Sequence, residues 1–326
     1  MAGGGLGEFE RIRCFFAPLA GPGGLGLVDD AALVDCAPGQ RLVVTADAIV
    51  AGVHYLPEDP PDLVARKLLR VNLSDLAAMG ARPLHYILTT ALPAELGPEW
   101  LAKFAEGLAE DQRRYGIDLL GGDSVGTAGP AVLSLTAIGE VAAGQEIRRS
   151  GAQPGDLVWV SGSIGDAFLG LGVLRGAHPD LSRQHREYLV GRFRLPEPRA
   201  ELGPRLRGTA HAMIDVSDGL LADLGHICET SGTAAVVEMS RLPLSPAARS
   251  VVERSRDIPP RLAAAGDDYE LLFAAPPGAT EAIVALSSPP QTPVTRIGRI
   301  EAGTGVRLVD DNGRTIPVEA AGYRHF

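Results

Sequence analysis

Lysine, cysteine and long apolar runs are all scarce in this chain of 326 residues. No apolar run approaches the roughly 20 residues that span a bilayer, so no membrane-spanning helix is expected. Three cysteines, Cys14, Cys36 and Cys228, stand far apart. They form neither a CxxC pair nor a disulfide framework, which favours a reducing compartment. The N-terminus lacks a basic segment followed by an apolar one, so we expect a cytoplasmic protein without a secretion signal.

Several common catalytic motifs are absent as well. The lysines, Lys67 and Lys103, lie outside any G-x-x-x-x-G-K-[ST] motif, which excludes a P-loop enzyme. The sequence holds no H-R-D or D-F-G tripeptide, no G-x-S-x-G elbow and no H-E-x-x-H motif. Gly21–Gly26 fits G-x-G-x-x-G, but no strong strand pattern precedes it, and we interpret it as a flexible turn. The net charge of −10 argues against a nucleic-acid-binding surface.

The chain does contain strand and helix patterns, and their mixture without a regular βαβ rhythm predicts an α+β fold. Its length and its 45% apolar content predict two globular domains. Periodicity is lost between about Ala143 and Gly155, which predicts a boundary between domains 1–145 and 146–326. In the first domain we expect helices at Glu8–Phe16, Pro61–Met79 and Glu99–Tyr115, and strands at Arg41–Ala46, Pro83–Ala91, Ile117–Leu120 and Val132–Ile138. In the second we expect strands at Leu157–Val160, Ala212–Asp215, Ala234–Glu238, Glu270–Ala274 and Val294–Ile300, and helices at Gly165–Leu174, Gln184–Phe193, Pro198–Leu206 and Asp218–Thr230.

Aspartates recur at the ends of these apolar elements. They are Asp29 and Asp30, Asp47, Asp75, Asp123, Asp215 and Asp218, and Asp267 and Asp268. An ionised carboxylate in apolar surroundings is costly unless a cation, hydrogen-bond donors or water accompany it. Short carboxylates that converge from several elements are the usual ligands of Mg²⁺, which takes its remaining oxygens from water and substrate phosphates.

A plainer interpretation stands beside each motif. Asp29 and Asp30 fit an exposed acidic turn equally well. Asn72 and Asp75 share one stripe of their helix and could be a structural buried pair, although we favour a ligand role. Gly121 and Gly122 permit a close approach to phosphate but also fit a simple turn. Ser217 or Asp218 could only cap the helix that follows, which leaves Asp215 unexplained.

Six collinear runs resemble the thiamine-monophosphate kinase family, whose larger group includes aminoimidazole ribonucleotide synthetase and selenophosphate synthetase. The runs are Val71–Ala81, Gly121–Asp123, Arg149–Ala152, Asp215–Leu220, Gly266–Leu271 and the Gly-Tyr-x-His-Phe ending. The resemblance implies two domains, each with a mixed or antiparallel sheet and flanking helices. The first binds metal and ATP and pairs with a second copy to form a barrel in a homodimer, and the second completes the active site. The implied reaction is ATP-dependent phosphorylation of thiamine monophosphate to thiamine diphosphate.

The resemblance also implies roles for matching residues. The implied magnesium ligands are Asp30, Thr45, Asp47, Asp75, Asp123, Asp215 and Asp218. The implied nucleotide contacts are Tyr115, Gly122, Asp123, Arg149 and Ser217, with Asp218 and Arg149 catalytic. His54 and Asp267 match substrate-contact positions, and Tyr323 is a further candidate. Three positions depart from the family pattern: Val28 replaces a glycine, Asp267 a common glutamate, and Ala320 the tryptophan of some relatives.

The chemistry agrees with this family. An acidic site that binds two phosphate-bearing substrates needs several Mg²⁺ ions between the carboxylates and the phosphates. An acceptor phosphate with a second pKa of about 6 is already mostly dianionic at neutral pH, so direct in-line transfer needs no strong base. Two alternatives remain. One is a related ATP-dependent synthetase, although the cysteine expected of such relatives is missing. The other is a non-catalytic protein that binds Mg-nucleotide. No nucleic-acid or membrane partner is expected.

Overall fold

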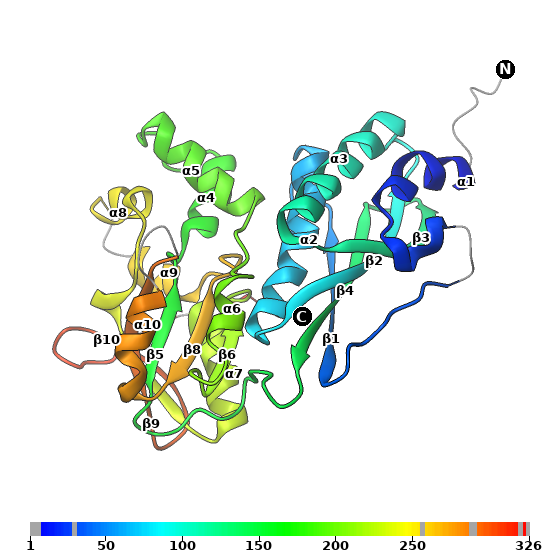
Figure 1. Cartoon of the computed structure of the whole chain (residues 1–326). Coiled ribbons are helices and arrows are strands. Elements are labelled where there is room, and N and C mark those ends of the chain that lie inside the picture. The colour runs from blue at the N-terminus through cyan, green and yellow to red at the C-terminus, as the bar shows by residue number, and fades with distance from the viewer. Residues whose placement is uncertain (1–7, 28–30, 255–257, 287–291, 319–321, 324–326) are drawn as a thin grey trace. The chain divides into compact units, whose positions relative to one another are not determined.

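The computed structural model describes residues 8–27, 31–254, 258–286, 292–318 and 322–323. The chain divides into two compact units. The first unit comprises Met1–Leu76 and Ala81–Gly144, and the second comprises Ala77–Gly80 and Gln145–Phe326. Each unit is built around one mixed sheet with helices packed against it (Figure 1). The predicted α+β fold is therefore confirmed.

The sheet of the first unit has four strands in the order β1-β4-β2-β3. They are β1 (Gln40–Val50), β4 (Val132–Ala142), β2 (Arg82–Pro93) and β3 (Asp118–Thr127). Neighbours are antiparallel except for the parallel pair β2 and β3. Alternate residues of β2 face opposite sides: Leu88 and Thr90 are buried, whereas Ile87 is exposed. The buried face lies against α2 (Pro61–Ala78) and α3 (Pro98–Tyr115), and the other face of the sheet is the outer face (Figure 1).

Two strands run further than the sequence predicted. We expected β1 to stop before Asp47, but it pairs with β4 through Val50, so Asp47 lies within the strand. We expected the Gly121–Asp123 motif to follow a strand, but β3 continues through it to Thr127, paired with β2. In both cases a polar residue or a glycine suggested an end, while the partner strand continues the hydrogen bonding beyond it.

The N-terminal segment differs in detail from the expected helix at Glu8–Phe16. A short helix α1 (Glu8–Arg11) leads into a π-helical turn at Ile12–Phe16. The glycine-rich segment forms two short 3₁₀ turns within Pro22–Leu27, separated by a kink at Leu25 and Gly26, where φ is 51° and 69°. Gly24 of this segment is buried against the backbone of Leu119 and Leu120, where a Cβ would lie 2.9 Å from the Leu120 carbonyl oxygen. Glycine is therefore required for packing here.

The sheet of the second unit has six strands in the order β10-β7-β9-β5-β8-β6. They are β10 (Gly305–Val309), β7 (Ala234–Glu238), β9 (Val294–Glu301), β5 (Leu157–Ser161), β8 (Leu271–Ala275) and β6 (Ala212–Asp215). Only β10 and β7 run parallel among these neighbours. Both faces are covered. Val158 and Val160 join a core beneath α7 (Leu220–Ser231), whereas Trp159 packs on the opposite face with α6 (Leu202–Arg205) and α10 (Thr280–Leu286).

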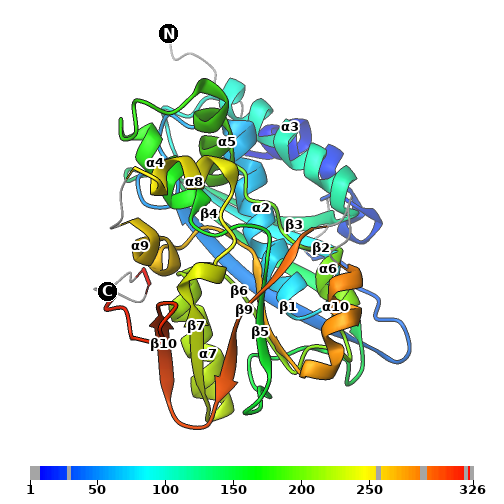
Figure 2. The same ribbon diagram turned by 90° about the vertical axis from the view of Figure 1, so that its left-hand side faces the viewer.

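Four further helices of the second unit gather beside one end of its sheet (Figure 2). They are α4 (Asp166–Leu174), α5 (Arg183–Arg194), α8 (Pro246–Val252) and α9 (Ile258–Ala264). Leu169, Leu189, Val251 and Leu262 form their shared core. The sequence did not predict α8, α9, α10 or β10. Of the helix expected at Pro198–Leu206, only α6 (Leu202–Arg205) forms. No helix in the described ranges is long and apolar enough to cross a membrane.

Candidate active site

Thr45 and Asp75 meet beneath the sheet of the first unit. Thr45 lies on β1 and donates a hydrogen bond from its hydroxyl to Asp75 Oδ2 on α2, at 2.6 Å. Both side chains are half-buried. A hydroxyl and a carboxylate that face each other at the edge of a core are oxygen donors of the kind that Mg²⁺ accepts. The structure thus brings together two of the predicted metal ligands.

Asn72 has a different role from Asp75, although both lie on one stripe of α2. Its buried side-chain amide donates to the Leu68 carbonyl at 2.9 Å and accepts from the Asp47 N–H at 3.1 Å. Asn72 therefore links β1 to α2 through their backbone groups. Its role is structural, which is the plainer of the two roles that the sequence left open for it. The bond also holds the backbone of Asp47, a third predicted ligand, close to the Thr45–Asp75 pair.

His54 lies in the turn that follows β1. Its Nδ1 accepts a hydrogen bond from the Val50 N–H at 3.0 Å, so the neutral ring carries its proton on Nε2. The buried ammonium group of Lys67 donates to the His54 carbonyl at 2.9 Å. Lys67 of α2 thus holds the backbone of His54, the predicted substrate contact.

Tyr115 ends α3 and lies against a buried ion pair. Arg70 on α2 donates to both carboxylate oxygens of Asp111 on α3, at 2.6 and 3.0 Å, and both residues are almost fully buried. The Arg70 guanidinium also lies 5.5 Å from the centre of the Tyr115 ring. This cation–π contact holds one face of the predicted nucleotide-contacting ring in place.

Gly122 and Asp123 lie side by side within β3. Gly122 has φ 157°, and a Cβ at this position would lie only 1.7 Å from the Leu88 carbonyl oxygen. The parallel register pairs Asp123 with the exposed Thr89. Cross-strand partners share a face of the sheet. Asp123 is therefore exposed on the outer face, whereas Thr45 and Asp75 lie beneath the inner face.

The second unit carries its candidates at the junction between β6 and α7. Asp215 ends β6 and is almost fully buried. The turn formed by Ser217, Asp218 and Gly219 follows before α7 begins at Leu220. Neither Ser217 nor Asp218 caps this helix, because the N-cap is Gly219, with φ 137° and no side-chain cap. The capping interpretation is therefore wrong, and both side chains are available for another role.

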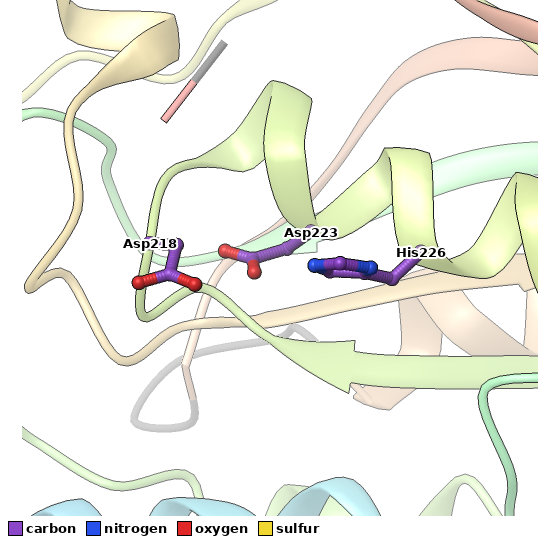
Figure 3. Close-up of side chains that lie close together, drawn as sticks. All are labelled: Asp218, Asp223 and His226. Atoms are coloured by element: carbon purple, nitrogen blue, oxygen red, sulfur yellow. The ribbon is translucent and has the colours of Figure 1, made fainter. Parts of the chain in front are cut away.

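Asp223, in the first turn of α7, takes the hydrogen bonds that a cap would accept. Its Oδ2 accepts the N–H of Ser217 at 3.1 Å and that of Gly219 at 3.0 Å. Burial, together with the nearby Asp218 carboxylate, raises the pKa of Asp223 to about 7. Ligand atoms of Asp218, Asp223 and the exposed His226 lie within 4.8 Å of one another (Figure 3). These oxygen and imidazole donors suit a divalent cation.

Asp267 lies beside the same turn in strained backbone. Its φ is 70° and that of Tyr269 is 51°, in a region that side chains rarely adopt. The Asp267 N–H donates to the Ser217 carbonyl at 2.8 Å. Tyr323 approaches from the C-terminal segment, and its N–H donates to the Asp218 carbonyl at 2.9 Å. Both predicted substrate contacts of this unit are thus bonded to the turn that carries Ser217 and Asp218.

A buried ion cluster anchors the strained segment. The Glu270 carboxylate bonds to Ser161 at 2.6 Å, to Arg192 at 2.9 Å and to Arg199. Burial alone would raise the pKa of Glu270, but the two guanidinium groups outweigh it and hold that pKa below its usual range. Asp268 accepts the N–H groups of Gly165 and Ala167 at the start of α4, and burial raises its pKa.

Arg149 lies at the other end of α7. Its carbonyl accepts a hydrogen bond from Ser231, the last residue of that helix, and its side chain is exposed. At 1.5 Å per residue the helix is about 18 Å long. Ser217 and Asp218 precede its first residue, so this length separates them from the segment that carries Arg149. A further predicted ligand, Asp30, lies outside the described residues, as do Val28 and Ala320.

Comparisons with known proteins agree with this arrangement. Residues 28–141 match the family model "AIR synthase related protein, N-terminal domain", and residues 153–311 match the corresponding C-terminal domain. The thiamine-monophosphate kinase of Caulobacter vibrioides is 43% identical over 323 residues, which cover 98% of this chain and 90% of that protein. The chain belongs to the thiamine-monophosphate kinase family.

Solved structures of this family share the fold along most of the chain. The thiamine-monophosphate kinase of Stenotrophomonas maltophilia K279a is 43% identical, with a TM-score of 0.81 over 89% of this chain and 91% of that chain. AaThiL complexed with AMPPCP and TMP is 30% identical, with a TM-score of 0.78 over 98% of this chain and 97% of that chain. The resemblance inferred from the six sequence runs is therefore confirmed.

Sequence reasoning missed several residues that shape the site. Lys67, Arg70 and Asp111 are buried charges beneath the first-unit candidates, and Asp223 and Glu270 are buried acids beside those of the second unit. Asp223 offered one usable signal, because an aspartate in the first turn of a helix can reach back to unpaired backbone N–H groups. Glu270 offered none, since its arginine partners are more than 70 residues away.

Proposed function

We propose that this protein transfers the γ-phosphoryl group of ATP directly to thiamine monophosphate, giving ADP and thiamine diphosphate. The observation that carries this function is the similarity along 98% of the chain to AaThiL, which was solved with AMPPCP and TMP. AMPPCP is an analogue of ATP, and the two ligands together represent the donor and the acceptor. The Thr45–Asp75 pair and the Ser217–Asp218 turn supply the oxygen-rich surfaces that such a reaction requires.

The acceptor phosphate is itself the nucleophile. One of its oxygens forms a bond to the γ-phosphorus while the bond from that phosphorus to the bridging oxygen of ADP breaks. A phosphate monoester with a second pKa of about 6 is already mostly dianionic at neutral pH. No side chain is therefore needed to remove a proton, and the chain's residues bind and orient the two phosphates.

Magnesium fits the donor chemistry of the described site. Bound Mg²⁺ would neutralise phosphate charge and orient the transferred group. Half-buried carboxylates and a hydroxyl are hard oxygen ligands, and they lie in both units. The ligands we propose are Asp30, Thr45, Asp47, Asp75, Asp123, Asp215 and Asp218. They serve several ions, because Asp123 lies on the outer face of the sheet whereas Thr45 and Asp75 lie beneath its inner face.

The two substrates bind different sets of side chains in this proposal. Tyr115, Gly122, Asp123, Arg149 and Ser217 contact the nucleotide. His54, Asp267 and Tyr323 contact thiamine monophosphate, and the Nε2 proton of His54 is suited to donate to its phosphate. Asp218 acts closest to the transferred group, whereas Arg149, at the other end of α7, contacts a more distant part of the nucleotide.

We also propose that two copies pair through the outer face of the four-stranded sheet. Val44, Ile87 and Val125 lie on three different strands of this face with 61%, 38% and 48% of their surfaces exposed. An exposed apolar face of this kind is typical of a surface that another chain covers. Asp123 shares the face, so pairing would place it next to the second copy.

The proposed roles of the two domains follow from these assignments. Domain 1–145 binds metal and ATP and forms the dimer, and domain 146–326 completes the site.

We place the reaction in the cytoplasm. Cys14, Cys36 and Cys228 are free thiols in the structure, which suits a reducing compartment.

Phosphorus NMR of the reaction products tests the function. Protein, ATP and MgCl₂ are incubated with thiamine monophosphate, and a matched sample contains unphosphorylated thiamine. We expect ADP and a diphosphate ester in equal amounts with thiamine monophosphate, and no transfer to thiamine, which lacks the phosphate nucleophile. Equal turnover of both acceptors, or ADP with inorganic phosphate alone, would refute the proposal.

A further inference from the structure

The turn that carries Ser217 and Asp218 is held in place by one buried carboxylate, that of Asp223. Asp223 is only 2% exposed, yet its Oδ2 accepts the N–H groups of both Ser217 and Gly219, the residues on either side of Asp218. A single oxygen atom therefore fixes the backbone on both sides of Asp218.

The surrounding backbone leaves the turn little freedom to adopt another shape. A Cβ on Gly219 would lie 2.5 Å from the Ala264 carbonyl oxygen, and one on Gly266 would lie 2.1 Å from that of Ser217. The carbonyl groups of Ser217 and Asp218 accept N–H groups from Asp267 and Tyr323. The turn is thus enclosed by three segments, and Asp223 supplies the acceptor for its own N–H groups.

These bonds decide which groups the turn can offer to a ligand. The N–H groups of Ser217 and Gly219 already donate hydrogen bonds to Asp223, so they are not donors for a phosphate at this helix N-terminus. Ser217 can then meet a nucleotide through its hydroxyl, and Asp218 through its half-buried carboxylate. Figure 3 shows the carboxylates of Asp218 and Asp223 beside each other, with Asp223 toward the helix.

We propose that Asp223 is a positioning residue that aims the Ser217 hydroxyl and the Asp218 carboxylate at the nucleotide and its metal ion by holding the turn between β6 and α7. This inference rests on the proposed function and deepens it. A competing role is direct metal ligation by Asp223, because Asp223 lies within the Asp218–His226 group. The two roles differ in what they demand of residue 223. Positioning needs an acceptor oxygen at that place, whereas ligation needs the negative charge.

Three substitutions of Asp223 distinguish the need for an acceptor oxygen from the need for a negative charge. Asp223→Asn keeps an acceptor oxygen and removes the charge. Asp223→Ala removes the acceptor, and Asp223→Glu keeps the charge but moves the oxygen by one methylene. Asp156→Asn and Asp156→Ala are matched controls, because Asp156 is also a buried carboxylate that accepts a backbone N–H, from Gln153 at 2.8 Å, and it is outside the proposed site.

The main readout is the dissociation constant of AMPPCP in MgCl₂, measured by titration calorimetry on the full chain. Amide hydrogen exchange at Ser217 and Gly219 reports whether the turn is held. We expect Asp223→Asn to bind within about threefold of the unsubstituted protein and to keep both amides protected. Asp223→Ala and Asp223→Glu should bind about tenfold or more weakly and lose that protection, as residues that orient metal ligands do when replaced. Both Asp156 variants should bind normally.

Three results would overturn the inference. The first is a folded Asp223→Ala that binds AMPPCP normally, which would leave Asp223 a purely structural residue. The second is an Asp223→Asn that keeps its amide protection but loses binding, which would assign the effect to charge and hence to ligation. The third is normal binding by Asp223→Glu, which decides the case if Asp223→Ala does not fold. AMPPCP binding needs no acceptor, so a protein that binds it but fails to phosphorylate thiamine monophosphate would refute the proposed function alone.

Discussion

The Thr45 hydroxyl donates to Asp75 Oδ2 across 2.6 Å and joins β1 to α2 at the centre of the first unit's candidate site. A hydrogen-bond donor that fixes one carboxylate oxygen leaves the other oriented toward a cation. Thr45 is thus close enough to orient Asp75 and also carries an oxygen that could itself bind metal.

Thr45→Val should therefore weaken the apparent affinity for Mg²⁺ without unfolding the protein. We expect the Mg²⁺ concentration for half-maximal activity to rise by about tenfold, as for other partners of metal-binding carboxylates. Initial rates over a series of MgCl₂ concentrations measure the shift. Thr280→Val removes a hydroxyl that donates to the Pro277 carbonyl at 2.7 Å, and it should leave the curve unchanged. An unchanged curve for Thr45→Val would remove Thr45 from the site.

Gly122→Ala should destabilise the first unit. The new Cβ would lie 1.7 Å from the Leu88 carbonyl oxygen, so β3 must separate from β2. We expect a loss of about 3 kcal/mol in the free energy of unfolding, at the upper end for single substitutions. Urea unfolding measures it. Gly121→Ala is the matched control, because nothing lies within 4 Å of a Cβ there. Equal stability of the two variants would show that β2 and β3 do not pair as described.

Glu270→Gln should destabilise the second unit in a pH-dependent way. The variant leaves Arg192 and Arg199 without their shared carboxylate, which costs about 3–5 kcal/mol for a buried pair. Because the folded-state pKa of Glu270 is lowered, its contribution is present above the unfolded-state pKa of about 4.3 and is lost as pH falls through the folded-state value. The stability difference between the variant and the unsubstituted protein should therefore be largest at neutral pH and shrink in acid.

Chemical unfolding at pH 7 and at successively lower pH measures this difference. Glu301 is a suitable control, since it also pairs with two arginines, Arg299 and Arg307, but at the surface. We expect Glu301→Gln to change stability by less than about 1 kcal/mol at every pH. A difference for Glu270→Gln that stays constant with pH would mean that the charge of its carboxylate contributes nothing to folding.

Val44→Glu should dissociate the proposed homodimer. Val44 is 61% exposed on the outer face, and a charge there would be buried without a partner when two sheets pair. Light scattering coupled to size exclusion gives the molar mass. Val53→Glu is a control of similar exposure, 56%, in the turn after β1. We expect a monomer for Val44→Glu and a dimer for Val53→Glu. Dimers for both variants would exclude this face as the interface.

Uninterrupted apolar runs made much of the fold predictable. The bounds of β6 and β7 match the prediction, because both strands are buried and end at polar residues. The ends of β1 and β3 were wrong because a strand's length depends on its partner, which a local pattern does not contain. The missed helices α8, α9 and α10 have seven residues each, too few to establish a periodic pattern.

The candidate site was likewise predictable only in part. The resemblance led to Thr45 and the aspartate motifs led to Asp75, and the structure joins these two residues. The motifs also led to Ser217, Asp218 and Asp267, which share one junction. They gave little indication of the buried partners of these residues, although Asn72 was noted as a possible structural residue. Asn72, Lys67, Asp223 and Glu270 act through contacts that exist only once the chain has folded. Assignment of each predicted residue to metal, nucleotide or acceptor remains a prediction.

The most direct test of the account is the effect of Mg²⁺ on AMPPCP affinity in the unsubstituted protein and in Asp75→Asn. Asp62→Asn, in the first turn of the same helix, is the control. If carboxylates hold the ions that let phosphates approach, Mg²⁺ should strengthen binding by about tenfold or more in the unsubstituted protein and in Asp62→Asn, and much less in Asp75→Asn. Equal affinity with and without Mg²⁺ in the unsubstituted protein would contradict the account.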